Sequence, residues 1–269
     1  MKNFFLFILL ILNVQKIDSQ AQFYYNKDNG VVTTVYGCAL TGGTAHQLSA
    51  GWTHIVHRQN FYKNSGSYLF YNALNGTAVT TRDANQDFVT TSTTSMGIGW
   101  THVVKIENAD KILFYNSNSG LALVTDANLV TILSNSIASG WTHVVSIDTS
   151  ILFYNANSGA GTVTNTSFLT ISTHSMAGGW THIIKLPSGV LFYNSISGVS
   201  TLADNINLST LRTFTFQLGW THIVPPESCP LLFYSSHTGQ GIQMNAGFRI
   251  VNTQAMAGSW TTILGLTVL

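Results

Sequence analysis

This chain has nine histidines, several of which recur at one position of a repeated sequence, and imidazole is both a common metal ligand and a common acid–base group. Five of them follow a Trp-Thr pair: His54, His102, His143, His182 and His222. Because each belongs to a different repeat, a metal site would require separated segments to converge. We therefore expect these rings to form structural hydrogen bonds, within one repeat or to the next, and we predict no metal site and no cofactor.

The tryptophans share the same motif and have two interpretations. The motif reads Gly-Trp-Thr-His or a variant of it, and the last copy is Ser259-Trp260-Thr261-Thr262. An exposed indole face can stack on a sugar ring, whereas a buried one fills a core. One tryptophan at the start of a strand in every repeat is typical of core packing. The candidate ligand-binding tryptophans are Trp52, Trp100, Trp141, Trp180 and Trp220.

A second motif, Phe-Tyr-Asn followed four residues later by Gly, alternates with the first. Its asparagines are Asn72, Asn116, Asn155 and Asn194; Asn26 carries the motif with Tyr24 in place of Phe, and Ser235 replaces the asparagine in a further copy. Asparagine bonds to nearby backbone and glycine adopts positive φ, so turn formation explains each copy alone. A ligand site repeated in every copy is the alternative, and these four asparagines are its candidate residues.

The elements that carry these residues are short strands. Both motifs recur about every forty residues, six times in all. In the repeat that starts at Gly179, strand-like runs cover 180–185, 190–193, 199–202 and 208–215, with turn residues between them. Such closely spaced turns predict antiparallel hairpins, and no window shows helical periodicity. Four antiparallel strands in a repeat of this length are typical of a propeller blade.

The sequence therefore predicts an all-β, six-bladed β-propeller of four-stranded antiparallel blades, in one domain over residues 22–269. The repeats start at the second strand type and end at the first, so the sixth blade must combine the strand at Trp260 with three N-terminal strands after Tyr24. This split blade closes the ring and removes free edges. The alternative, a linear solenoid, needs polar caps, whereas the sequence ends in the apolar run 263–269.

In such a ring, the turns of the asparagine motif and the linkers that precede each tryptophan lie on one rim, which we call the asparagine rim. Its six copies agree closely, for example Ser-Asn-Ser-Gly with Ala-Asn-Ser-Gly, whereas the turns of the opposite rim vary. A function repeated in each blade would produce this agreement. A fold that needs these turns would produce it too, so both interpretations stay open.

Residues 1–20 are predicted to be a signal peptide: Lys2 precedes the apolar run 4–14, and Ser19 and Ala21 offer cleavage points. The alternative is a membrane anchor, but spanning needs about 20 apolar residues. We expect a secreted, extracellular protein without a membrane span.

Secretion permits a disulfide between the two cysteines, Cys38 and Cys229, whose turns fall on the same rim of neighbouring blades. Two separate thiols are the alternative, because these turns differ in radial position. Sequons make Asn75, Asn165 and Asn207 candidates for glycosylation.

Composition disfavours nucleic-acid binding and catalysis. The formal net charge is +1 and no run of Lys or Arg appears, so the chain lacks a basic stripe for phosphates. None of the ten acidic residues recurs at one blade position, and a glycosidase needs a defined carboxylate pair; Asp83, Asp87, Asp126 and Asp204 would have to converge. Nucleophile-elbow, phosphate-loop and zinc-protease motifs are absent. The insert 57–67 is the only obvious place for a singular site. We predict no enzymatic activity.

The tandem Gly-Trp-Thr-His-Ile-Val and Leu-Phe-Tyr-Asn repeats resemble those of tachylectin-like β-propeller proteins, over residues 22–269. The resemblance implies a secreted lectin that binds N-acetylated amino sugars at equivalent sites, one per blade, in innate recognition. Its partners would be glycans or glycoproteins, and several weak sites would gain avidity on a glycan-coated surface. The alternative is a non-catalytic structural or protein-interaction propeller of the extracellular space.

Overall fold

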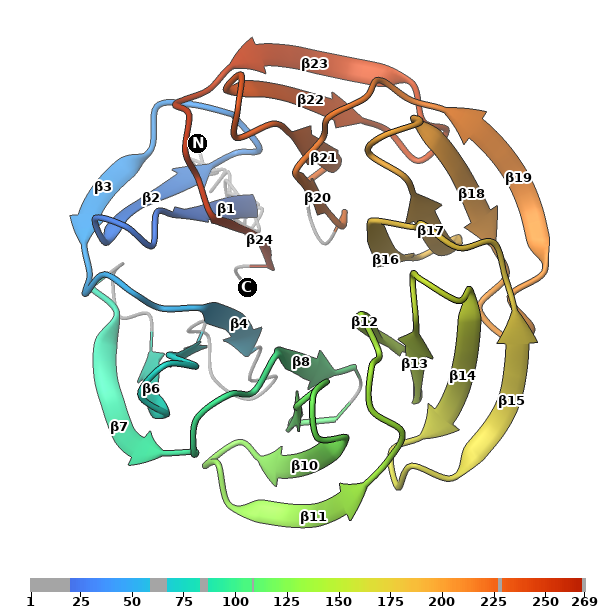
Figure 1. The fold of residues 1–269 in the computed structure, drawn as a ribbon. Helices are drawn as coiled ribbons and strands as arrows, with labels where there is room; N and C mark the ends of the chain where they lie inside the picture. Colours follow the sequence, from blue (N-terminus) through green and yellow to red (C-terminus); the bar gives the residue numbers. More distant parts are fainter. Residues whose placement is uncertain (1–19, 59–66, 83–86, 108, 227–228, 268–269) are drawn as a thin grey trace, which may run out of the picture.

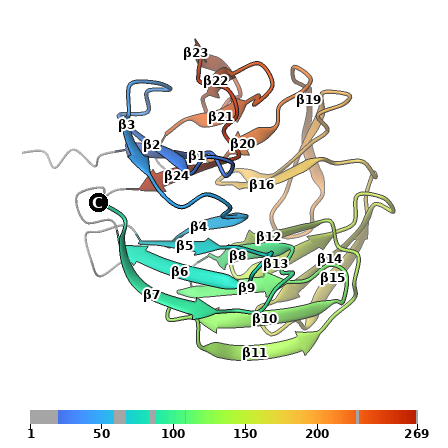
Figure 2. The same cartoon turned by 60° about the vertical axis from the view of Figure 1, so that its left-hand side comes forward.

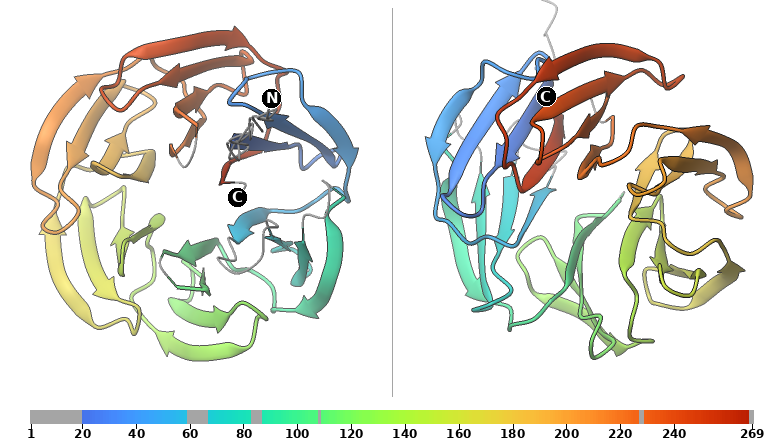
Figure 3. Two further views of the ribbon diagram at one scale, coloured as in Figure 1. Left: turned by 180° about the vertical axis from the view of Figure 1, so that it is seen from behind. Right: turned by 45° about the horizontal axis from the view of Figure 1, so that its top comes forward.

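The computed structural model describes residues 20–58, 67–82, 87–107, 109–226 and 229–267. In these residues, 24 strands form six four-stranded antiparallel sheets, which are arranged as blades around a central axis (Figure 1). The view from behind shows the same closed ring (Figure 3). The predicted six-bladed propeller is confirmed, and the linear solenoid is wrong.

Each complete blade contains four consecutive strands, from the inner strand at the axis to the outer strand. Blade 1 contains β4 (His54–Arg58), β5 (Ser67–Tyr71), β6 (Thr77–Arg82) and β7 (Val89–Ser95). Blade 2 contains β8 (His102–Ile106), β9 (Lys111–Tyr115), β10 (Leu121–Asp126) and β11 (Thr131–Ser136). Blade 3 contains β12 (His143–Ile147), β13 (Ser150–Tyr154), β14 (Ala160–Asn165) and β15 (Thr170–Ser175).

Blade 4 contains β16 (His182–Leu186), β17 (Gly189–Tyr193), β18 (Val199–Ala203) and β19 (Thr210–Thr215). Blade 5 contains β20 (His222–Val224), β21 (Leu231–Tyr234), β22 (Gln240–Met244) and β23 (Ile250–Ala255). The sixth, split blade contains β24 (Thr262–Thr267), β1 (Gln20–Tyr25), β2 (Val31–Tyr36) and β3 (Thr44–Gln47). Outer strands such as β7 and β11 form the outer wall (Figure 2).

The split blade closes the ring as predicted. Its strand order is β24-β1-β2-β3, and the C-terminal β24 pairs antiparallel with β1, with Tyr24 opposite Ile263 (Figure 1). Gln20 lies opposite Thr267, so both ends of the described chain leave the ring on the rim opposite the asparagine rim. Among the residues that the structure describes, the asparagine rim is therefore formed by turns and linkers.

Burial follows the position of a strand within its blade. The second strands have apolar residues on both faces, as in the buried Leu152, Phe153 and Tyr154 of β13, because neighbouring blades pack on either side. The outer strands are rich in Thr and Ser and are mostly exposed, as in β7. The core is thus divided into six apolar clusters, one at each joint between blades.

Strand boundaries differ slightly from those expected in the repeat at Gly179. The inner strand begins at His182 rather than Trp180, and the outer strand begins at Thr210 rather than Leu208. Leu208 has a φ of 54° and is buried between blades. Equivalent turns place Phe88, Leu129, Phe168 and Phe248 at positive φ as well. We attribute this unfavourable backbone geometry to the apolar side chain, which it directs into the joint.

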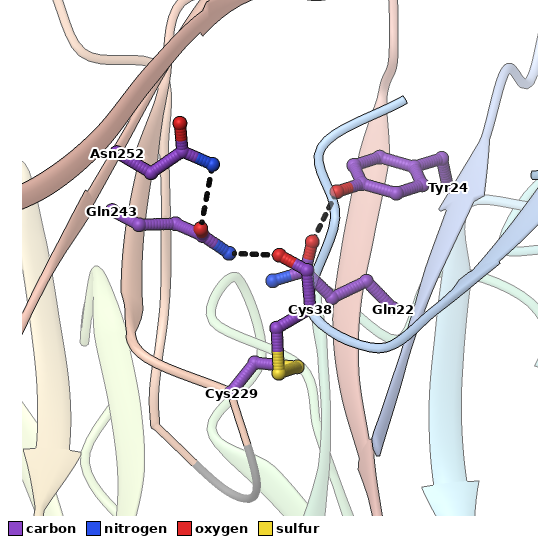
Figure 4. Close-up of a disulfide and its surroundings, with 6 residues drawn as sticks. All are labelled: Gln22, Tyr24, Cys38, Cys229, Gln243 and Asn252. Atoms are coloured by element: carbon purple, nitrogen blue, oxygen red, sulfur yellow. Dashed lines mark hydrogen bonds between the residues drawn. A yellow bond between two sulfur atoms is a disulfide. The ribbon is translucent and has the colours of Figure 1, made fainter. Parts of the chain in front are cut away.

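The disulfide joins the split blade to blade 5, and the alternative of two separate thiols is wrong (Figure 4). The Cα atoms of Cys38 and Cys229 lie 5.2 Å apart. In the segment after β2, Gly37, Cys38 and Gly42 adopt positive φ, and Leu40 is buried in the joint between these blades. Gln243 Nε2 donates to the Cys38 carbonyl over 2.9 Å.

We predict that replacing both cysteines with serine destabilises the protein strongly. The bond closes a loop between residues 191 positions apart, and loop-closure entropy of this size corresponds to about 5 kcal/mol. Urea unfolding of the oxidised wild type and of Cys38→Ser/Cys229→Ser measures the difference. Reduced wild type is the matched control and should resemble the variant. Equal midpoints for oxidised wild type and variant would contradict the prediction.

Candidate functional site

A buried tyrosine hydroxyl holds the linker that runs from one blade to the next at the asparagine rim. Tyr71 Oη donates to the Gly97 carbonyl over 2.9 Å and accepts the backbone N–H of Trp100 over 3.3 Å. The same tyrosine bonds a linker carbonyl in every blade: Tyr25, Tyr71, Tyr115, Tyr154, Tyr193 and Tyr234. The Phe-Tyr-Asn motif therefore fixes where each new blade begins.

The repeated histidines join neighbouring inner strands. Nε2 of His54 lies 3.0 Å from the carbonyl oxygen of Thr101 in the next blade, and Nδ1 lies 2.9 Å from Oγ1 of its own Thr53. The same two contacts recur at His102, His143, His182 and His222. Burial lowers the pKa of all five rings. We infer neutral rings that donate from Nε2–H and accept the threonine hydroxyl at Nδ1.

One joint cannot have this bond. Thr262 occupies the histidine position of β24, at the joint between the split blade and blade 1. A threonine side chain is too short to reach the next strand in the same way. Within the described residues, no group of three or more His, Cys, Asp or Glu side chains is arranged to hold a metal ion.

The four candidate asparagines stabilise the turns of the rim. Oδ1 of Asn155 accepts the backbone N–H groups of Asn157 and Ser158 over 2.9 and 3.1 Å, and its Nδ2 donates to the Gly140 carbonyl over 2.9 Å. Oδ1 of Asn72, Asn116 and Asn194 also accepts two turn N–H groups each. Nδ2 of Asn194 likewise donates to the Gly179 carbonyl, so the carboxamides of Asn155 and Asn194 also join the turn to the linker beside it.

The candidate tryptophans lie in the joints between blades. Trp100, Trp180 and Trp220 are less than a tenth exposed, while Trp52 and Trp141 are half-buried. Each indole packs against the phenylalanine of its own second strand, with ring centroids 5.8–6.2 Å apart. Tryptophan and asparagine come together beneath the rim, where both serve the packing of the blade.

The groups that the rim presents to solvent are the turn tips, which the motifs did not identify. The tip residue stands two positions after the asparagine or its replacement, and it is exposed in all six blades: Asp28, Leu74, Asn118, Asn157, Ile196 and His237. A second exposed residue comes from the linker, which bonds to the turn through Gly99 N–H and the Ala73 carbonyl in blade 1. Aligning the six copies with one another would have marked these positions, because they vary where their neighbours do not.

The other predicted residues lie on both rims. Asn75 is exposed on the asparagine rim. Asn165, half-buried at the end of β14, and Asn207, exposed in the turn after β18, lie on the opposite rim. Asp126 ends β10 and Asp204 follows β18, and each accepts two backbone N–H groups of the turn that follows. Asp83 and residues 59–66 of the insert lie outside the described residues, which contain no helix long and apolar enough to cross a membrane.

Comparison with known proteins identifies the fold alone. No family model and no curated protein matches the chain. A structure of a protein of unknown function from Bacteroides caccae is 9% identical to this chain, with a TM-score of 0.61. The match covers 92% of this chain and 99% of the other. BBS1N in complex with ARL6DN is 12% identical with a TM-score of 0.59, covering 94% and 86%. Apo AztD from Citrobacter koseri is 8% identical with a TM-score of 0.54, covering 92% and 98%.

The incomplete set of histidine bonds yields a stability prediction. We expect Thr262→His to stabilise the protein by about 1 kcal/mol, because it adds an inter-blade hydrogen bond at the one joint without it. Removing one of the existing bonds should have the opposite effect: His143→Ala should lower the free energy of unfolding by about 1–3 kcal/mol, because it leaves the Thr181 carbonyl unpaired. Urea unfolding measures both, with His174→Ala in outer strand β15 as the control. A neutral or stabilising His143→Ala would contradict the role of the histidines.

Stability should fall on acidification. Burial lowers the pKa of the five repeated histidines, and burial together with Lys105 lowers that of His57 to about 4. The unfolded chain, with histidine pKa values near 6.5, then binds more protons than the folded one. This stability is complete above pH 6.5 and decreases below it, by about 3 kcal/mol for His57 alone at pH 4. Urea midpoints from pH 7.5 to 4.5 test this, and a flat profile would contradict it.

Proposed function

We propose that this chain is a secreted, non-catalytic carbohydrate-binding protein whose glycan sites repeat around the asparagine rim. The observation that carries the proposal is the exposed turn tip that every blade presents on this one rim. The resemblance of the sequence repeats to those of tachylectin-like proteins supports N-acetylated amino sugars as the ligand class. The disulfide and the exposed sequon at Asn75 support an extracellular location.

Blades 2 and 3, whose turn tips are polar, offer the groups that a sugar requires. In blade 3, Asn157 and Ser158 are exposed at the tip, while Asn155 fixes the backbone beneath them. In blade 2, Asn118 and Ser119 occupy the same positions above Asn116. Amide and hydroxyl groups can donate to and accept from sugar hydroxyls and an acetamido group. The half-buried Trp141, at the joint between blades 2 and 3, is the candidate apolar surface beside them, and the half-buried Trp52 has the same place at the joint between the split blade and blade 1.

Separate weak sites would act together through the ring. Six tips on one rim can contact several residues of a dense glycan surface at once, and simultaneous binding raises avidity without any strong single site. The rim geometry suits a surface-bound ligand better than a single small molecule. Protein ligands are the second candidate, favoured by the exposed leucine and isoleucine tips of blades 1 and 4.

A glycan array followed by titration with N-acetylglucosamine oligomers tests the proposal. We expect binding to N-acetylated amino sugars, and we expect Asn118→Ala/Ser119→Ala/Asn157→Ala/Ser158→Ala to weaken it about tenfold or more, because each deletes a side-chain hydrogen bond. Asn207→Ala on the opposite rim is the control and should bind like wild type. Absence of binding to every glycan class would end the lectin proposal.

A further inference from the structure

Two of the six blades present apolar side chains at both exposed positions of the asparagine rim. In blade 1 the tip Leu74 is 83% exposed and the linker residue Ile98 is 69% exposed. In blade 4 the tip Ile196 is 80% exposed and the linker residue Leu218 is 55% exposed. Large apolar side chains this exposed on a soluble domain commonly mark an interaction site.

Tip and linker residue are neighbours within each blade. Gly99 N–H donates to the Ala73 carbonyl in blade 1, and Gly219 N–H donates to the Ser195 carbonyl in blade 4, both over 2.9 Å. These bonds place Ile98 beside Leu74 and Leu218 beside Ile196. We call the four residues Leu74, Ile98, Ile196 and Leu218 the apolar rim pairs.

The two positions change together among the blades. Both are large and apolar in blades 1 and 4, whereas the other blades have a polar tip beside a small linker residue. These are Asp28 with Ala50, Asn118 with Ser139, Asn157 with Gly178, and His237 with Gly258. The fold therefore accepts a polar tip and a small linker residue at these positions, so packing within the blade does not require the apolar rim pairs.

The apolar rim pairs lie opposite each other in the ring. Inner strands β4, β8, β12, β16, β20 and β24 are neighbours in that order, and β24 returns to β4. Blades 1 and 4 are thus three steps apart in a ring of six, which is half a turn (Figure 1). A two-fold axis in the plane of the rim, passing between blades 2 and 3, exchanges the positions of blades 1 and 4.

The same axis matches every other tip with a compatible one. It places Asn118 of one copy against Asn157 of the other, and two carboxamides can donate to and accept from each other. It also places the Asp28 carboxylate against the His237 imidazole, a donor–acceptor pair of compatible charge. The apolar pair of blade 1, Leu74 with Ile98, then lies against the apolar pair of blade 4, Ile196 with Leu218. Self-complementarity of this kind is what an isologous dimer requires.

We propose that the asparagine rim binds a second copy of this chain, face to face about that two-fold axis. The rim is suited to this because both ends of the described chain leave on the opposite rim. The inference does not depend on the proposed glycan binding. Because the dimer covers the same tips, it predicts that glycan and second copy exclude each other.

Sedimentation velocity of the purified protein in the absence of glycan, over a wide concentration range, tests the dimer. N-glycans are first removed enzymatically, because Asn75 adjoins Leu74. We expect reversible dimerisation. We expect Leu74→Asn/Ile98→Ser/Ile196→Asn/Leu218→Gly, which copies the residues of blades 2 and 3, to raise the dissociation constant about a hundredfold or more. Ile206→Asn is the matched control, since Ile206 is 83% exposed in a turn of the opposite rim.

An exchange of charge tests the register of the two copies. Asp28→His and His237→Asp alone should each weaken the dimer, and the double variant should restore it. A purely structural role of either residue gives no such rescue. Three results would each overturn the proposal: a monomer at every concentration, a dimer unaffected by the four apolar-rim substitutions, or no rescue in the Asp28→His/His237→Asp variant. So would a monomer whose apolar rim pairs are needed instead for binding phosphatidylcholine vesicles.

Discussion

Each joint between blades depends on polar backbone groups that are satisfied by side chains of fixed position. The inner strands meet around the axis, where an unpaired carbonyl or N–H group would be costly. One tyrosine hydroxyl per blade satisfies the linker, and one histidine ring satisfies the threonine carbonyl of the next inner strand at five of the six joints. The repetition of Thr, His, Tyr and Asn follows from this single requirement, whereas the repeated tryptophans pack against phenylalanine in the joints.

This requirement separates the residues of the fold from the residues available for recognition. A side chain that holds a joint has little freedom to bind a ligand, because its donors and acceptors are already occupied. Asn155 illustrates this, with Oδ1 and Nδ2 both bonded to backbone. The tip residues two positions further on do not hold a joint, and their side chains vary, as in Asp28, Leu74 and His237. Variation against a constant framework is what a recognition surface shows in a repeat protein.

The fold could be predicted because strand, turn and repeat signals agree in every copy. The split blade followed from the phase of the repeat at the two ends, and β24 lies beside β1 as that phase requires. The cysteine pair could not be decided from spacing alone. It depends on the path of the segment after β2, where Leu40 is buried in the joint and two glycines adopt positive φ.

The sequence alone could not separate binding residues from structural ones, for a physical reason. Sequence motifs mark what is constant, and in this ring the constant residues are mostly structural. A sugar-binding site and a joint between blades contain the same kinds of side chain, aromatic and amide. Only the hydrogen bonds and the burial of these side chains distinguish the two roles. Trp220, almost fully buried, and Asn118, exposed at its tip, differ in burial, which the composition of their motifs does not show.

The most direct test of this account is nitrogen-15 NMR of the histidine side chains near pH 7. The account predicts that His54, His102, His143, His182 and His222 are neutral, carry their proton on Nε2, and exchange that proton slowly because it is bonded to the next blade. Rings protonated on Nδ1, or rings that titrate near pH 6.5 with fast exchange, would contradict the claim that the repeated residues hold the ring together.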